Sequence, residues 1–128
     1  MAAYFNRNIY FGPVRNNLLQ FQFSKAKLST SPLSRSVASF AYPGTTPSVS
    51  ANGSSNGIVW AIEHSGPNDV LHAYQAANLA KELYNSNQAG NRRDQFGISS
   101  HFGTPMIVNG KVYVGTTNGV AVFGLLGR

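Results

Sequence analysis

Three histidines, His64, His72 and His101, are the side chains best suited to chemistry, because an imidazole can act as a base or a metal ligand near neutral pH. His64 and His72 flank one expected hairpin. If His64 pairs with Val70, the two histidines become diagonal neighbours about 7–8 Å apart on one face. With His101 and a water they could then hold a divalent metal such as zinc, which activates water for hydrolysis. A packed, neutral imidazole is the commoner state of a mid-strand histidine such as His72, so no metal is favoured and no cofactor is expected.

Charged residues near these histidines supply the remaining candidates. Asp94 could orient His101 as an acid–base pair, and the adjacent Arg92 and Arg93 could hold a phosphate or carboxylate. A solvated loop is the alternative for the two arginines. The candidate catalytic residues are His64, His101 and Asp94, and the candidate ligand-binding residues are Asp69, Arg92 and Arg93. We expect any ligand to be a small anion.

Composition removes several functions. The chain has no cysteine, which excludes disulfides, thiol catalysis and cysteine-bound metals. No apolar run is long enough for a membrane span, and residues 1–7 lack the apolar core of a signal peptide. The net charge of +6 comes from scattered residues and forms no basic helix or stacking platform, so a nucleic-acid partner is not indicated.

A repeat runs through the chain and must position the candidates. Residues 4–12 and 107–115 both read as an apolar pair, an Asn-led turn and an apolar–Tyr–apolar–Gly strand, and residues 49–62 form a looser middle copy. A third strand follows each copy, at 18–23, 70–74 and 120–125. Asn109-Gly110 and Asn118-Gly119 favour two-residue hairpins. The pattern predicts an all-β chain of about eleven antiparallel strands in three sheets.

The repeat also sets the boundaries of three units, which we place at residues 3–42, 46–87 and 103–126, with a long connection over 85–102. Outer strands are expected at 37–42 and 82–87. Residues 73–84 would also suit a helix, but the repeat favours strand, turn, strand. If each unit is an antiparallel sheet whose alternate turns lie on the same side, these turns and the long connection would gather six residues on one rim: His64, Asp69, Arg92, Arg93, Asp94 and His101.

The motif Thr104-Pro105 followed by Val112-Tyr113-Val114-Gly115 resembles the pyrroloquinoline-quinone-like β-propeller repeat, as does the segment 71–84. The resemblance implies about three propeller blades, similar to the C-terminal end of a longer secreted or periplasmic bacterial chain. It does not imply the quinone, because the family's enzymes use a vicinal cysteine pair that this chain lacks. Gln75 and Tyr84 stand where the family has Asp and Trp, which predicts looser docking between blades.

These observations favour a propeller fragment that acts as an assembly and ligand-binding module without a quinone cofactor. Two alternatives remain open: a small hydrolase of activated or phosphate esters on the His/Arg rim, and a carbohydrate-binding propeller that stacks sugars on Trp60 or Tyr10.

Neither end of the chain looks capped, since the first unit opens with apolar strands and residues 120–126 end the last one without an outer strand. Such surfaces favour association. We therefore expect a homo-oligomer, a dimer above all, whose two chains complete one ring.

Overall fold

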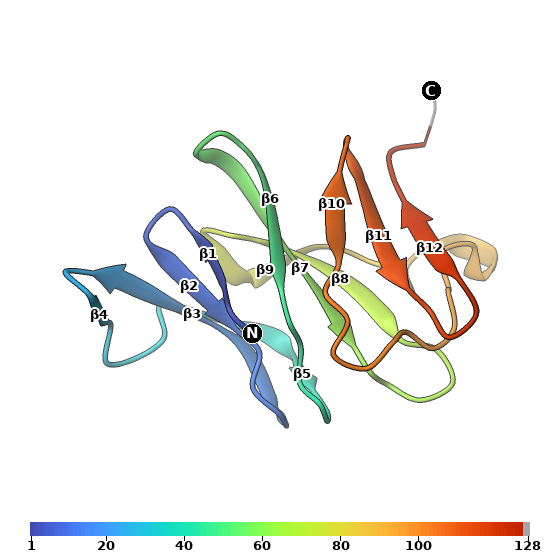
Figure 1. The fold of residues 1–128 in the computed structure, drawn as a ribbon, viewed down its shortest axis with the longest axis horizontal. Helices are drawn as coiled ribbons and strands as arrows, with labels where there is room; N and C mark the ends of the chain where they lie inside the picture. The colour runs from blue at the N-terminus through green and yellow to red at the C-terminus, as the bar shows by residue number, and fades with distance from the viewer. Residues whose placement is uncertain (127–128) are drawn as a thin grey trace.

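The computed structural model describes residues 1–126 and contains twelve β-strands in three antiparallel sheets, with one 3₁₀ turn at Gly90–Arg92 (Figure 1). Sheet 1 contains β1 (Ala3–Phe5), β2 (Asn8–Phe11), β3 (Asn16–Ser24), β4 (Lys27–Leu28) and β5 (Ser34–Phe40). Sheet 2 contains β6 (Ser48–Asn52), β7 (Ser55–Glu63), β8 (Val70–Gln75) and β9 (Asn78–Asn85). Sheet 3 contains β10 (Met106–Val108), β11 (Lys111–Gly115) and β12 (Val120–Phe123). The all-β prediction is confirmed, including two strands rather than a helix over 73–84.

The three sheets repeat the same strand register. In each sheet, one row of paired residues faces the next sheet along the chain and is called the forward row, and the neighbouring row faces the preceding sheet and is called the backward row. The forward rows are Ala3/Tyr10/Gln20, Ser48/Trp60/Ala73 and Met106/Tyr113/Val122. The backward rows are Tyr4/Ile9/Phe21, Val49/Val59/Tyr74 and Ile107/Val112/Phe123. Side chains alternate between the faces of a strand, so the two rows of one sheet point in opposite directions.

The sheets stack in chain order, with β1, β6 and β10 next to one another along one side (Figure 1). The forward row of sheet 1 packs on the backward row of sheet 2, where Tyr10 lies in one buried cluster with Val59 and Tyr74. The forward row of sheet 2 packs on the backward row of sheet 3, where Trp60 lies against Val112. Sheet 2 is therefore covered on both faces, which explains why every residue from Val70 to Tyr74 is buried.

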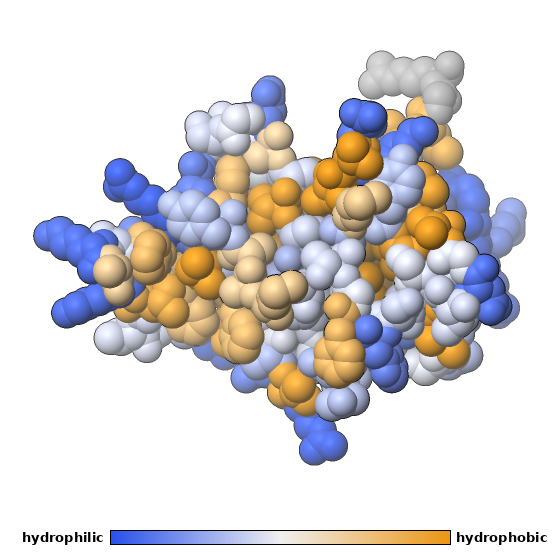
Figure 2. All heavy atoms as spheres, viewed as in Figure 1, coloured by the Kyte–Doolittle hydropathy of each residue, from blue (hydrophilic) through white to orange (hydrophobic). Residues whose placement is uncertain are grey.

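The two outer faces of the stack carry exposed apolar side chains. On sheet 1 the backward row carries Tyr4, which is 60% exposed, and on sheet 3 the forward row carries Met106 and Val122, at 57% and 54%. Apolar side chains are visible at both ends of the stack (Figure 2). No helix among residues 1–126 is long and apolar enough to cross a membrane.

Several expected details are corrected by the structure. The outer strands begin earlier than predicted, at Ser34 and Asn78, because they pair along the ends of β3 and β8. Asn109-Gly110 forms the expected two-residue hairpin, with both φ angles positive. Asn118-Gly119 does not, because Gly115 pairs with Val120 and Thr116 N–H donates to the Gly119 carbonyl, which makes a four-residue loop.

Candidate functional site

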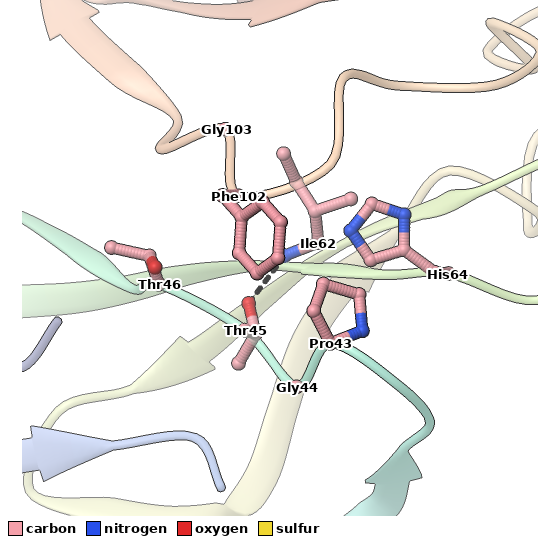
Figure 3. Close-up of a pocket in the computed structure, with 8 residues that line it drawn as sticks. All are labelled: Pro43, Gly44, Thr45, Thr46, Ile62, His64, Phe102 and Gly103. Atoms are coloured by element: carbon pink, nitrogen blue, oxygen red, sulfur yellow. Dashed lines mark hydrogen bonds between the residues drawn. The ribbon is translucent and has the colours of Figure 1, made fainter. Parts of the chain in front are cut away.

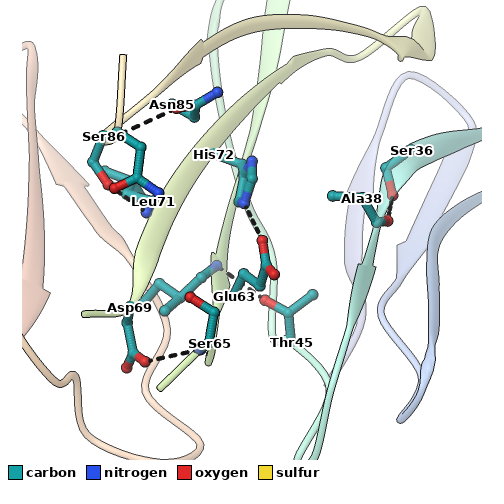
Figure 4. Close-up of polar contacts among 12 residues, drawn as sticks. Ser36, Ala38, Thr45, Glu63, Ser65, Asp69, Leu71, His72, Asn85 and Ser86 are labelled. Carbon is teal, nitrogen blue, oxygen red and sulfur yellow. Dashed lines mark hydrogen bonds and ion pairs between the residues drawn. The ribbon is translucent and has the colours of Figure 1, made fainter. Parts of the chain in front are cut away.

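The turn between β7 and β8 and the long connection before β10 meet around one buried carboxylate. Asp69 is 2% exposed and accepts hydrogen bonds from His64 Nδ1 at 2.9 Å, the Ser65 amide at 3.3 Å and the Ser99 amide at 2.8 Å. The Ser99 hydroxyl donates to the same carboxylate at 2.5 Å. The Asp69 amide in turn donates to the Gly97 carbonyl, so the turn and the connection are tied together from both sides. The bond from Ser65 to Asp69 is drawn in Figure 4.

The bond to Asp69 fixes the tautomer of His64. A carboxylate only accepts hydrogen bonds, so in the neutral ring the proton lies on Nδ1 and the lone pair on Nε2. Figure 3 shows one ring nitrogen of His64 turned toward Ile62 and Phe102, inside a small pocket that Thr45, Thr46 and Pro43 also line. The pocket has a volume of about 10 Å³, which is room for about one water molecule. The geometry could therefore polarise a single water.

His101 joins this group through its ring. The imidazoles of His64 and His101 lie edge to face with their centroids 5.1 Å apart, and His101 also contacts the ring of Phe102. Of the six rim candidates, the structure brings together His64, Asp69 and His101. Sequence reasoning missed Ser99, whose only signal was its place in the long connection.

The other three rim candidates lie elsewhere. Asp94 accepts bonds from Arg93 Nε at 2.7 Å and from the Tyr84 hydroxyl at 2.7 Å, and not from His101 as expected. The Arg93 guanidinium, followed by the Tyr84 hydroxyl, lowers the pKa of Asp94. Burial and the bond to Asp94 raise the pKa of Tyr84. Arg92 is exposed in the 3₁₀ turn.

The predicted register of the two hairpin histidines is wrong by one residue. Glu63, not His64, pairs with Val70, and His72 lies opposite Ala61. His72 is 5% exposed, with Nδ1 2.5 Å from Glu82 and Nε2 2.8 Å from Glu63. The contact with Glu63 is drawn in Figure 4. His72 is therefore packed as expected, but both of its ring nitrogens face carboxylates, and a neutral imidazole has only one N–H to donate. The alternative three-histidine set is not assembled, and residues 1–126 contain no group of three or more His, Asp or Glu side chains placed to hold a metal ion.

A much larger cavity lies between sheets 2 and 3. This cleft, of about 730 Å³, reaches from Ser50 and Trp60 to the Arg93–Asp94 pair at its rim. Its apolar wall is formed by Ile58, Phe96, Ile107, Val112, Ala121, Phe123, Leu125 and Leu126. Trp60, expected to be core, is only partly buried here and donates from Nε1 to Ser50 Oγ at 2.9 Å. Tyr10 is fully buried and donates to the Ala76 carbonyl, so it cannot stack on a sugar.

Comparison with known proteins adds no relative: no family model matches the chain, and no curated protein or solved structure matches it significantly.

Proposed function

We propose that this chain is a three-blade segment of a β-propeller of the pyrroloquinoline-quinone-like type, without the quinone, and that it works as an assembly module that completes a ring with a second copy of itself. The observation that carries the proposal is the repeated register. Tyr10, Trp60 and Tyr113 occupy the same place in the three sheets, and the first two point into the next sheet.

The repeat makes the two outer faces complementary to each other. Tyr113 lies in the forward row of sheet 3, and residues 1–126 provide no further sheet for that row to pack on. Tyr4 lies in the backward row of sheet 1, and residues 1–126 provide no sheet before it. A forward face packs on a backward face at both contacts inside the chain. The same contact between two chains is head-to-tail, and two such contacts close a ring of six sheets.

Solution mass tests the proposal directly. We expect light scattering to give the mass of a dimer. A substitution that introduces a charged residue on either outer face should give a monomer near 13.7 kDa. Tyr4→Arg and Met106→Arg suit this test because both side chains are more than half exposed, so folding should survive. In a head-to-tail ring either variant alone is sufficient to break both contacts. A dimer through like faces would survive one of the two, and a monomeric wild type at high concentration would refute the proposal.

A second candidate function, hydrolysis of an activated or phosphate ester, is favoured by one observation: the His64–Asp69 pair leaves Nε2 facing a pocket of one-water size. A histidine held by a carboxylate is the usual arrangement of a general base. Turnover of p-nitrophenyl phosphate or acetate should then fall about 100-fold in His64→Gln and less in His101→Gln, which alters only a ring contact. Equal turnover in all three proteins would remove this candidate.

A further inference from the structure

Sheet 3 differs from its neighbours at its outer edge. In sheets 1 and 2 a further strand pairs with the third one, β5 with β3 and β9 with β8. Within residues 1–126, β12 is paired only with β11. We infer that the β12 edge together with the cleft is a binding site for an extended peptide of a partner protein, which adds a fourth strand and inserts one aliphatic side chain into the cleft.

The free edge of β12 presents backbone groups in a usable direction. In β8 both backbone groups of Leu71 face the β9 side, since Leu71 N–H donates to Ser86 Oγ and the Leu71 carbonyl accepts from Ser86 N–H. The repeated register places Val120 where β8 has Leu71, and alternate residues of a strand share one direction. The N–H groups of Val120 and Val122 therefore point away from β11 and are available to an added strand.

The cleft matches the side chain that such a strand would carry. Among the residues of β9 that face sheet 1, Leu79 alone is fully buried, and it packs with Tyr10 and Leu18. Trp60 is the counterpart of Tyr10 in the next sheet, and it lines the cleft, where residues 1–126 provide no fourth strand with a counterpart of Leu79. One leucine-like residue at that register would cover Trp60 and fill apolar volume. The Arg93 guanidinium at the rim is already paired with Asp94, so the site selects its peptide by strand pairing and by this one aliphatic side chain.

The chain carries its own reporter for this test, because Trp60 is its only tryptophan. The probe is a synthetic peptide with the sequence of β9, residues 78–85, because that strand fills the equivalent place in sheet 2. Titration with selective tryptophan excitation should give a saturable change in Trp60 emission. The matched control is the Leu79→Asn peptide, which should bind at least about tenfold more weakly because it cannot bury an aliphatic side chain.

Two protein variants separate the edge from the cleft. Val122→Pro removes one outward N–H without touching the bonds to β11, and proline is tolerated on an edge strand. Ala121→Phe fills the cleft, since Ala121 lines it beside Trp60. Both should abolish the emission change while circular dichroism stays unchanged. Retained binding in Val122→Pro, equal binding of the control peptide, or no saturable change in wild type would each overturn the inference.

The peptide site does not depend on the proposed ring. Met106→Arg, which should be monomeric, keeps the cleft and the β12 edge, so it should bind the peptide as wild type does. Peptide binding by Met106→Arg but not by an oligomeric wild type would show that a second copy covers the edge, and would overturn the assignment to a partner peptide. Failure of the ring with peptide binding intact would count against the proposed function alone.

Discussion

The two interfaces between the sheets are built on one register and are packed differently. At the filled interface, between sheets 1 and 2, Phe5 packs so closely on Gly57 that a Cβ there would lie 2.4 Å from its ring. At the open interface, between sheets 2 and 3, Ser50 stands where Phe5 would be and Ala121 where His72 would be. The cleft lies at these smaller residues. The repeated register thus fixes where the sheets meet, and side-chain volume decides whether the space between them becomes core or a cleft.

Truncating the equivalent aromatic residues should give the largest difference. Tyr10→Ala removes a fully buried ring and its bond to Ala76, and we expect a loss of about 4 kcal/mol in the free energy of unfolding. Trp60→Ala should lose about half as much, because water already reaches the cleft. Urea unfolding of both variants checks the comparison. Equal losses would mean that the open interface is as well packed as the filled one.

Two glycines at equivalent positions test the same difference by adding a methyl group. Gly57→Ala should destabilise by about 3 kcal/mol, because its Cβ would collide with Phe5 and lie 2.8 Å from the Ala76 Cβ. Gly110→Ala meets nothing within 4 Å, and its φ of +69° alone should cost about 1 kcal/mol. Thermal unfolding measures both. A larger effect at Gly110 would contradict the packing argument.

Filling the open interface should make it resemble the other one. Ser50→Phe places at Ser50 the side chain that Phe5 supplies in sheet 1, and the cleft has room for it. The variant loses the bond from Trp60 but buries a ring, so we expect a net gain of about 1 kcal/mol. Ser50→Ala is the control that loses the bond alone and should be less stable than wild type. A Ser50→Phe protein no more stable than that control would show that the cleft cannot accept the ring.

The filled interface should respond to alkaline pH. Burial raises the pKa of Tyr10 to about 12, and burial with the charges of Glu82 and Glu63 raises the pKa of Tyr74. A tyrosine whose pKa is raised by folding stabilises the fold fully below its unfolded pKa of about 10, and this contribution disappears as the pH rises toward 12. The melting temperature of wild type should fall over that range, and that of Tyr10→Phe should fall less steeply. Parallel curves would contradict the assignment to Tyr10.

The stability contribution of Asp94, at the open interface, should depend on pH in the acid range. This is the smallest of the expected effects. Folding lowers the pKa of Asp94, so its contribution is present above the unfolded value of about 3.8 and is lost as the pH falls through the folded value. Asp94→Asn should therefore be slightly less stable than wild type at neutral pH, and the difference should shrink as the pH falls below about 3.8. Melting temperatures across the acid range measure it. A difference that persists in strong acid would point to packing rather than charge.

The sequence predicted most of the fold because the repeat is local. The aromatic residues Tyr10 and Tyr113 with their following glycines mark the second strand of sheets 1 and 3, and Asn109-Gly110 sets one hairpin. The predicted starts of the strands were less accurate where apolar and polar residues alternate weakly. In β9, for example, the residues from Ala80 to Leu83 are all exposed. The blade assignment and the ring remain predictions.

The site was harder to predict because it depends on loops and register. The hairpin joining β7 and β8 has six residues, and a change of one in its pairing moved His72 from the partner of His64 to the partner of Glu63 and Glu82. The topological argument grouped His64, Asp69 and His101, and these three residues do lie together. Arg93 and Asp94 occur earlier in the same connection, and Asp94 is bonded to the Tyr84 hydroxyl instead. The cleft had one sequence signal, the small Ser50 in the place of Phe5.

The forward and backward rows also determine how this architecture would respond to a change in length. Every sheet touches only its neighbours, so stability behaves as a sum of one contribution per sheet and one per contact, as in a linear array. Inserting a further copy of residues 46–102 would add one contribution of each kind. The number of solvent-exposed outer faces would stay at two. Longer arrays of this unit should therefore unfold more cooperatively and at higher temperature than the three-sheet chain.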